Sequence, residues 1–83
     1  MLARAFVLIS TEPGSGEEVP EKLKTLKFVK EVYRVYGVYD AVVVTEVENA
    51  KDLRGLVFDK IRRVQGVRST LTMMAVKGFT KNK

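Results

Sequence analysis

The chain has 83 residues and a formal net charge of +5, and a chain of this length holds one domain and no more. Its 46% share of apolar residues excludes intrinsic disorder as the main state, because apolar burial can offset the entropy of ordering the chain. There is no cysteine and no histidine. Disulfides, the usual zinc sites and the Ser-His and Cys-His nucleophile pairs are therefore excluded. These absences favour a binding module, without metal or cofactor, over an enzyme.

The positive charge is spread through the chain. Three lysines, Lys77, Lys81 and Lys83, lie in the last seven residues, and a charged terminal tail raises the net charge without forming a binding face. We therefore interpret the charge as solvated surface and expect no direct contact with nucleic acid. No apolar run approaches the roughly 20 residues of a membrane span, and no secretory signal pattern occurs. The sequence thus predicts a cytoplasmic protein without membrane contact.

The first predicted element is a strand. Residues 2–11 are nearly all apolar, and such a run of β-forming residues is typical of a strand buried on both faces. The Pro-Gly-Ser-Gly segment at residues 13–16 then predicts a loop. Its Gly-Ser-Gly triplet lacks the rest of a phosphate-binding motif, so we interpret it as a turn.

A short helix is expected after this loop. Ser15 and Glu18 have the spacing of a capping box, in which each side chain bonds the backbone N–H of the other residue. Three apolar residues then recur at the spacing of one helix face: Val19, Leu23 and Leu26. Residues 25–28 should end this helix.

Residues 29–36 and 41–48 are rich in β-branched residues and predict two strands of a hairpin. The Gly37-Val38-Tyr39-Asp40 segment between them is the sharpest local feature of the sequence. Gly37 would let backbone amides approach a ligand carboxylate, and Asp40 could pair with an ammonium group. The alternative is a β-turn in which the aspartate bonds nearby backbone.

A second helix and a last strand complete the domain. Asn49 with Asp52 forms a helix-start signal, and Gly66 is a natural residue at the helix end because the left-handed backbone region costs glycine little. Residues 67–76 predict the last strand. We assign residues 1–78 to the domain and residues 79–83 to a charged tail. The apolar face of the helix consists of Leu53, Leu56, Val57, Ile61 and Val64.

The last strand offers a second candidate site. Thr70 and Thr72 are two residues apart, so both hydroxyls lie on the same face of the sheet. Paired hydroxyls beside a hairpin carboxylate would suit a ligand of amino-acid size. The alternative is that these threonines reflect only their preference for strands.

The β-α-β-β-α-β order predicts a ferredoxin-like α+β fold, a four-stranded antiparallel sheet with both helices on one face. The strands are nevertheless apolar on both faces, as where Val42 and Val44 alternate with Val43. Six or more apolar side chains on the open face form a patch larger than soluble monomers usually expose. We therefore predict a homodimer in which the two open sheet faces pack together.

Together these features resemble the ligand-binding domain of the Lrp/AsnC transcription regulators, known as the RAM domain. The resemblance covers about residues 3–76, through Gly-x-Tyr-Asp at 37–40, Lys-Ile at 60–61, and Gly-Val-x-x-Thr-x-Thr at 66–72. It implies dimers that assemble into octamers or similar rings and bind small ligands, usually amino acids, between dimers. By resemblance, the ligand site contains Gly37, Tyr39, Asp40, Thr70 and Thr72.

Full regulators of this family carry an N-terminal helix-turn-helix domain, whereas this sequence begins at the first RAM strand and resembles the stand-alone members. We expect it to bind an amino acid, to co-assemble with a full-length regulator, or both. Two alternatives remain: a small enzyme of dimeric α+β-barrel or acylphosphatase type, and a purely structural partner subunit. The lack of histidine, with Asn49 and Asn82 as the sole asparagines, opposes the enzyme. Abundant Lys, Glu and Arg fit a thermophile.

Overall fold

The structure is a computed structural model that describes residues 3–76 and 78, without the side chains of residues 54 and 56–58. The order of elements is the predicted one, with a π-helical segment, η1, continuing the second helix. The elements are β1 (Ala3–Thr11), α1 (Glu18–Leu23), β2 (Val29–Arg34), β3 (Ala41–Val47), α2 (Ala50–Gly55), η1 (Leu56–Ile61) and β4 (Val67–Met74).

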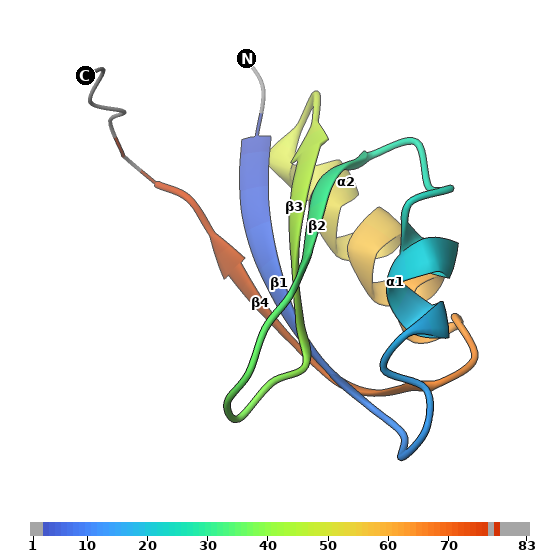
Figure 1. Cartoon of the computed structure of the whole chain (residues 1–83). Coiled ribbons are helices and arrows are strands. Elements are labelled where there is room, and N and C mark those ends of the chain that lie inside the picture. The colour runs from blue at the N-terminus through green and yellow to red at the C-terminus, as the bar shows by residue number, and fades with distance from the viewer. Residues whose placement is uncertain (1–2, 77, 79–83) are drawn as a thin grey trace.

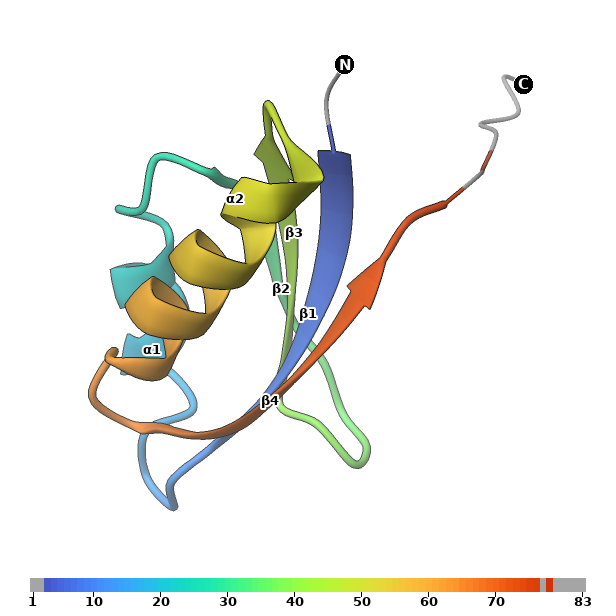
Figure 2. The ribbon, with the colours of Figure 1, turned by 180° about the vertical axis from the view of Figure 1, so that it is seen from behind.

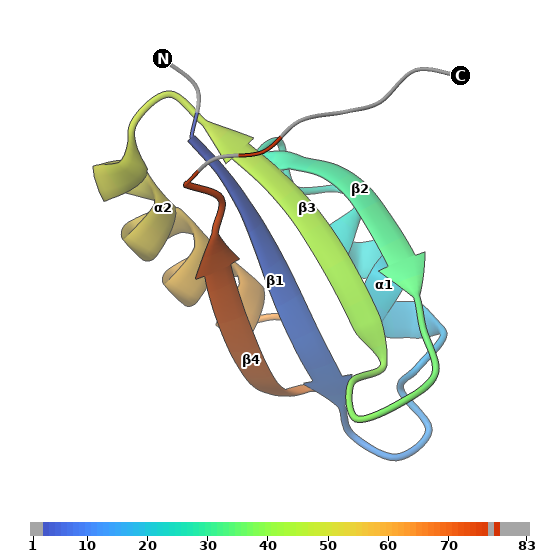
Figure 3. The same ribbon diagram turned by 90° about the vertical axis from the view of Figure 1, so that its left-hand side faces the viewer.

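The four strands form one antiparallel sheet in the order β2-β3-β1-β4. Both helices pack on the same face of this sheet, and the opposite face is left open (Figures 1 and 2). The predicted ferredoxin-like fold is therefore confirmed. The two edge strands are β2 and β4, and β1 runs through the centre between β3 and β4 (Figure 3).

The core lies between the sheet and the helices. Strand β1 contributes every second residue to it: Ala5, Val7 and Ile9 are fully buried, while Phe6 and Leu8 are half-buried on the other face. The expectation that this strand is buried on both faces is thus wrong for the single chain, because the helices cover one face only. The other core residues are Val19, Leu23, Ala41, Val43, Val47, Leu53 and Ile61.

Helix α1 does not begin with the predicted capping box. Its N-cap is Glu17, without a side-chain cap, and Ser15 contributes its backbone carbonyl, which accepts the N–H of Val19 at 3.2 Å. The side chain of Ser15 instead lies against Gly66, 3.0 Å from where a Cβ on that glycine would be. The helix ends at Leu23, so Leu26 packs against the core from the following turn.

The second helix ends earlier than the sequence predicts. It stops at Ile61, and two successive turns, in which Val64 and Val67 donate to the carbonyls of Ile61 and Val64, lead to β4. Gly66 has the expected left-handed backbone, with φ of +103°, but it lies in the second of these turns rather than at the helix end.

The strands are also shorter than predicted. Strand β2 ends at Arg34 rather than at residue 36, and β4 ends at Met74 rather than at residue 76. The predicted tail at residues 79–83 lies outside the described residues. Within the part of the chain that the structure describes, no helix is long and apolar enough to cross a membrane.

Candidate functional site

The predicted site residues come from two segments at one end of the sheet: the β2–β3 hairpin and the first half of β4. Ile9 on the central strand pairs with Ala41 on one side and with Thr70 on the other. Ala41, Ile9 and Thr70 therefore form one row across three strands. Asp40 is the residue directly before Ala41, so it lies next to the end of this row. With neighbouring strands about 4.8 Å apart, the two positions are separated by about 10 Å. This is the span of a small ligand.

Asp40 fastens the base of the hairpin to the end of β1. Its Oδ2 accepts the backbone N–H of Thr11 at 2.7 Å and the Thr11 hydroxyl at 3.2 Å. The backbone N–H of Asp40 donates to the carbonyl of Ile9 at 2.8 Å. The aspartate thus bonds backbone, as the alternative interpretation expects, but the partner lies 29 residues away rather than inside the turn. Its Oδ1 has no hydrogen-bond partner among the described residues, and the residue is half-buried.

Thr11 belongs to the corner formed by the base of the hairpin and the end of β1, although the sequence did not single it out. It is the last residue of an apolar strand and carries no motif of its own. The only available signal was its place at the same end of the predicted sheet as the hairpin, and its exact neighbour depends on strand register. The hydroxyl of Thr11 is part of the polar surface beside Asp40.

The hairpin tip bends away from the sheet on the side opposite the helices (Figures 1 and 2). Gly37 has a φ of +140° at the tip, a left-handed value that glycine adopts easily, and a Cβ there would meet no atom within 4 Å. Tyr36 and Val38 on either side of it are almost fully exposed, whereas Tyr39 is half-buried. Two large apolar side chains in solvent at a projecting tip are typical of a surface that contacts another molecule.

Thr70 and Thr72 lie on the same sheet face, as predicted. They pair with Ile9 and Val7, which are both buried on the helix side of the sheet. The two threonines are half-buried. Thr70 is in the row next to Asp40, and Thr72 is one row further toward the middle of the sheet. The structure therefore brings Asp40 and Thr70 to one corner, with Thr72 behind them and Gly37 farther out at the tip.

The open sheet face is apolar at its centre. Phe6 pairs with Val44 and Met73, and Leu8 pairs with Val42 and Leu71, so these side chains form two adjacent cross-strand rows. No described helix lies over them (Figure 3). In the single chain Leu71 is 46% exposed and Met73 is 47% exposed. The predicted patch on the open face is therefore present and includes Phe6, Leu8, Val42, Val44, Leu71 and Met73.

Polar pairs surround this patch. Arg4 and Glu46 form an ion pair at 2.6 Å at one end, and the hydroxyls of Ser10 and Ser69 lie 2.5 Å apart at the other. On β2, Tyr33 donates a hydrogen bond to the carboxylate of Glu31. This hydrogen bond and the negative charge of Glu31 raise the pKa of Tyr33 above its usual 10.0. An apolar centre with a paired polar rim is the usual anatomy of a protein–protein interface.

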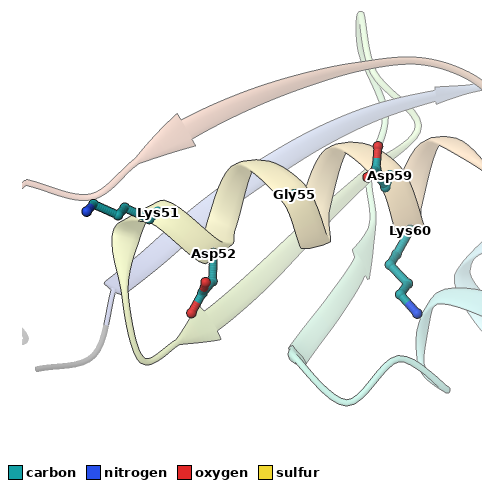
Figure 4. Close-up of a pocket in the computed structure, with 5 residues that line it drawn as sticks. All are labelled: Lys51, Asp52, Gly55, Asp59 and Lys60. Carbon is teal, nitrogen blue, oxygen red and sulfur yellow. The ribbon is translucent and has the colours of Figure 1, made fainter.

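The outer side of the second helix carries a separate feature. A hollow of about 410 Å³ opens there to solvent, lined by Lys51, Asp52, Gly55, Asp59 and Lys60 (Figure 4). None of the predicted site residues lines it. The described residues contain no group of three or more Asp or Glu side chains that could hold a metal ion.

The fold and its surfaces define a ferredoxin-like α+β domain with an interface-like open face and a polar corner beside a projecting hairpin. Residues 4–83 match the family model of the Lrp/AsnC ligand binding domain. The chain therefore belongs to this family, as its motifs predict.

The relatives include regulators and solved domains. An uncharacterized HTH-type transcriptional regulator of Pyrococcus horikoshii is 36% identical over 74 residues, which cover 86% of this chain and 49% of that protein. The chain thus spans about half the length of the curated relatives that it matches. The crystal structure of FFRP-DM1 is 42% identical, covers 89% of this chain and 99% of its own, and has a TM-score of 0.84. A feast or famine regulatory protein of M. tuberculosis complexed with L-methionine is 27% identical, with coverages of 98% and 54% and a TM-score of 0.81.

Proposed function

We propose that this domain binds an amino acid at the corner formed by its hairpin and β4, and that it does so as a homodimer assembled into a larger ring. The observation that carries the proposal is the half-buried carboxylate of Asp40, held through Oδ2 by Thr11 while Oδ1 has no described partner. A carboxylate held in place with one free oxygen suits an ammonium group. Membership of a ligand-binding family and the L-methionine complex of a relative support the ligand class.

In this proposal each predicted residue has a separate role. Asp40 accepts the ligand ammonium. The backbone at Gly37 and Tyr39 offers N–H groups to the ligand carboxylate, because the bare glycine permits close approach. Thr70 and Thr72 add hydroxyls that can donate or accept. A single chain leaves this corner open, so a neighbouring subunit is needed to close it, and the exposed hairpin tip is suited to that contact.

A screen against the twenty amino acids tests the ligand class. We expect one or a few of them to raise the melting temperature of the assembled protein, since a ligand at 100 times its Kd stabilises the folded state by about 2.7 kcal/mol. Calorimetry would then give the affinity and the number of sites per chain. A folded oligomer whose melting temperature responds to none of the twenty would contradict the proposal.

Asp40→Asn separates the ligand role of this residue from its structural role. The asparagine oxygen can still accept the Thr11 N–H, so we expect the free energy of unfolding to change by less than about 1 kcal/mol. Loss of the charge facing a partly desolvated ammonium should weaken binding by about 2–5 kcal/mol. Asp40→Ala is the matched control, which should lose both binding and about 1–3 kcal/mol of stability, because the Thr11 N–H loses its acceptor. Unchanged affinity in Asp40→Asn would show that the ligand lies elsewhere.

Co-assembly with a full-length regulator is a second candidate role. It is favoured by the relatives that match this chain over about half their length, because such regulators carry the same domain. A ring that mixes both kinds of subunit would bring extra ligand sites to the regulator. Native mass spectrometry of the domain co-expressed with a full-length regulator from its own organism tests this role. Mixed species support it, and two separate homo-oligomers contradict it.

Two alternative functions, an enzyme and a purely structural subunit, differ from our proposal in different ways. The enzyme has no supporting feature among the described residues: Asn49 is at the start of α2, where its carbonyl accepts the N–H of Asp52, and Asn82 lies outside them. The family to which the chain belongs is a ligand-binding domain of transcription regulators. The purely structural subunit differs from our proposal in one respect, the absence of a ligand, so the amino-acid screen decides between them.

A further inference from the structure

The outer face of the second helix carries charges whose pattern is complementary to itself. Among the charged residues whose described side chains line the hollow there, Lys51 and Asp52 lie before Gly55, and Asp59 and Lys60 follow it, so the signs of these four run plus, minus, minus, plus around a central glycine. All five residues are exposed and line one hollow (Figure 4). In the part of the chain that the structure describes, none of these four charges has an ion-pair partner.

The π-helical segment η1 explains why residues eight apart share this face. In a regular α-helix, with 3.6 residues per turn, two such positions differ by about 80° around the axis. Bonding from residue i to i+5 in η1 widens the turn and reduces the rotation per residue. Asp59 is thereby brought back toward the row of Lys51 and Gly55, and Lys60 toward Asp52. Figure 4 shows Asp52 and Lys60 on the same side of the helix.

A two-fold axis that passes between the Gly55 residues of two copies places these charges opposite charges of the other sign. Lys51 is four residues before the glycine and Asp59 is four residues after it. When two copies of the helix pack antiparallel with their glycines in contact, each Lys51 therefore lies opposite the Asp59 of the other copy. Asp52 and Lys60, three before and five after, face each other along one flank, within reach of the long lysine side chain. The contact contains four ion pairs between chains, and each row pairs opposite signs.

Gly55 has no role in the fold of its own chain that would require a glycine. A Cβ at this position would meet no atom within 4 Å, and its φ is not in the left-handed region. Glycine in a helix is nevertheless less favourable than alanine. A residue that weakens its own helix and leaves the backbone bare in the middle of a hollow permits another backbone to approach closely.

We propose that α2 and η1 form an isologous contact with the same helix of a second copy, antiparallel and centred on Gly55. This contact rests on the proposed function, because it joins dimers made through the open sheet face. The helices lie on the opposite side of the sheet from that face (Figure 2), so every such dimer presents two helix surfaces. Two different two-fold contacts in one chain link dimers into a larger assembly. Exposed ion pairs are individually weak, but several contacts closing one ring reinforce one another.

Charge reversal with reciprocal rescue tests this contact. Lys51→Glu and Asp59→Lys each place like charges opposite one another, so at low salt each should weaken association between dimers at least tenfold and leave dimers in light scattering and native mass spectrometry. The double variant Lys51→Glu/Asp59→Lys restores opposite signs and should recover the wild-type mass. An equimolar mixture of the two single variants should also assemble, because every cross-pair is then complementary. Lys27→Glu, an exposed change in the turn after α1, is the matched control and should keep the wild-type mass.

A substitution that leaves the charges of the helix unaltered extends the test. Gly55→Leu should leave the dimer folded, since the position is open, but should block the approach of the second helix and abolish the larger assembly. Raising the salt to about 1 M should dissociate the wild type to dimers, because exposed ion pairs are screened at that concentration. Single variants with wild-type mass, or a double variant without rescue, would each overturn the contact while leaving amino-acid binding and the sheet-face dimer untouched. A wild type that stops at the dimer would overturn the contact together with the ring of the proposed function, and the amino-acid screen would then decide whether the dimer alone binds a ligand. A monomeric wild type that binds no amino acid would instead overturn the proposed function.

Discussion

Leu71→Glu is expected to convert the proposed homodimer into a folded monomer. Leu71 is in the apolar patch on the open face and is 46% exposed in the single chain, so the change should cost the monomer less than about 1 kcal/mol. In the proposed dimer the same position is covered by the facing sheet. The two-fold symmetry then buries two unpaired carboxylates, and burying a charge without a partner is costly. We expect the dimer Kd to rise at least about 1,000-fold, which corresponds to about 4 kcal/mol.

Met74→Glu is the matched control for this change. Met74 is in the same strand and is 47% exposed, but it pairs with Ala5 and therefore lies on the helix side of the sheet. Its replacement should leave the dimer intact. Sedimentation measurements on the two variants, with circular dichroism to verify the fold, decide the matter. If Leu71→Glu remains dimeric, or if both variants dissociate equally, the open face is not the dimer interface.

Gly66→Ala is expected to lower the free energy of unfolding by about 2–5 kcal/mol. Two effects add: the left-handed backbone at φ +103° costs a residue with a Cβ about 1–2 kcal/mol, and forced overpacking costs about 1–3 kcal/mol. The new Cβ would lie 2.7 Å from Cγ2 of Val19 and 3.0 Å from Cβ of Ser15. Val19 is fully buried, so any shift of its side chain would disturb the packing of the core. Since a small domain has only about 5–15 kcal/mol of stability, the loss would be plain in urea unfolding.

Gly14→Ala isolates the backbone part of this effect. Gly14 also has a left-handed backbone, with φ of +85°, but a Cβ there would meet no atom within 4 Å. Its replacement should cost only about 1–2 kcal/mol. The difference between the two variants measures the close packing of Gly66 against α1. Equal losses in both variants would mean that this contact can relax freely.

The elements themselves were predictable because their signals are local. The spacing of Val19 and Leu23 and the β-branched run of β3 depend on which residues are near one another in sequence. Val19, Leu23, Val43 and Val44 are buried in the structure. Details that depend on distant partners were not predictable. Ser15 fails to cap α1 because its side chain lies against Gly66, and no spacing rule contains that contact. The π-helical turn of η1 likewise has no sequence signal that we recognised.

In the candidate site, too, local features were predictable and features that depend on distant residues were not. The motifs singled out Asp40 and the two threonines by residue type and spacing. Thr11 was missed, because the bond between its N–H and Asp40 joins residues 29 apart and depends on the register of β1 against β3. Register also decides that Thr70 lies in the row beside the aspartate. A shift of one residue would move both threonines to the open face.

The sequence alone determined the family, the order of the elements and the fact that both faces of the sheet are apolar. It did so because hydrophobic periodicity and short motifs are properties of neighbouring residues. Tertiary structure alone decided which carboxylate oxygen of Asp40 binds Thr11, which apolar residues form the open patch, and how the charges around Gly55 align. Those features depend on strand register, on helix pitch and on which face the helices cover, and each of these is set by contacts between residues that are distant in the chain.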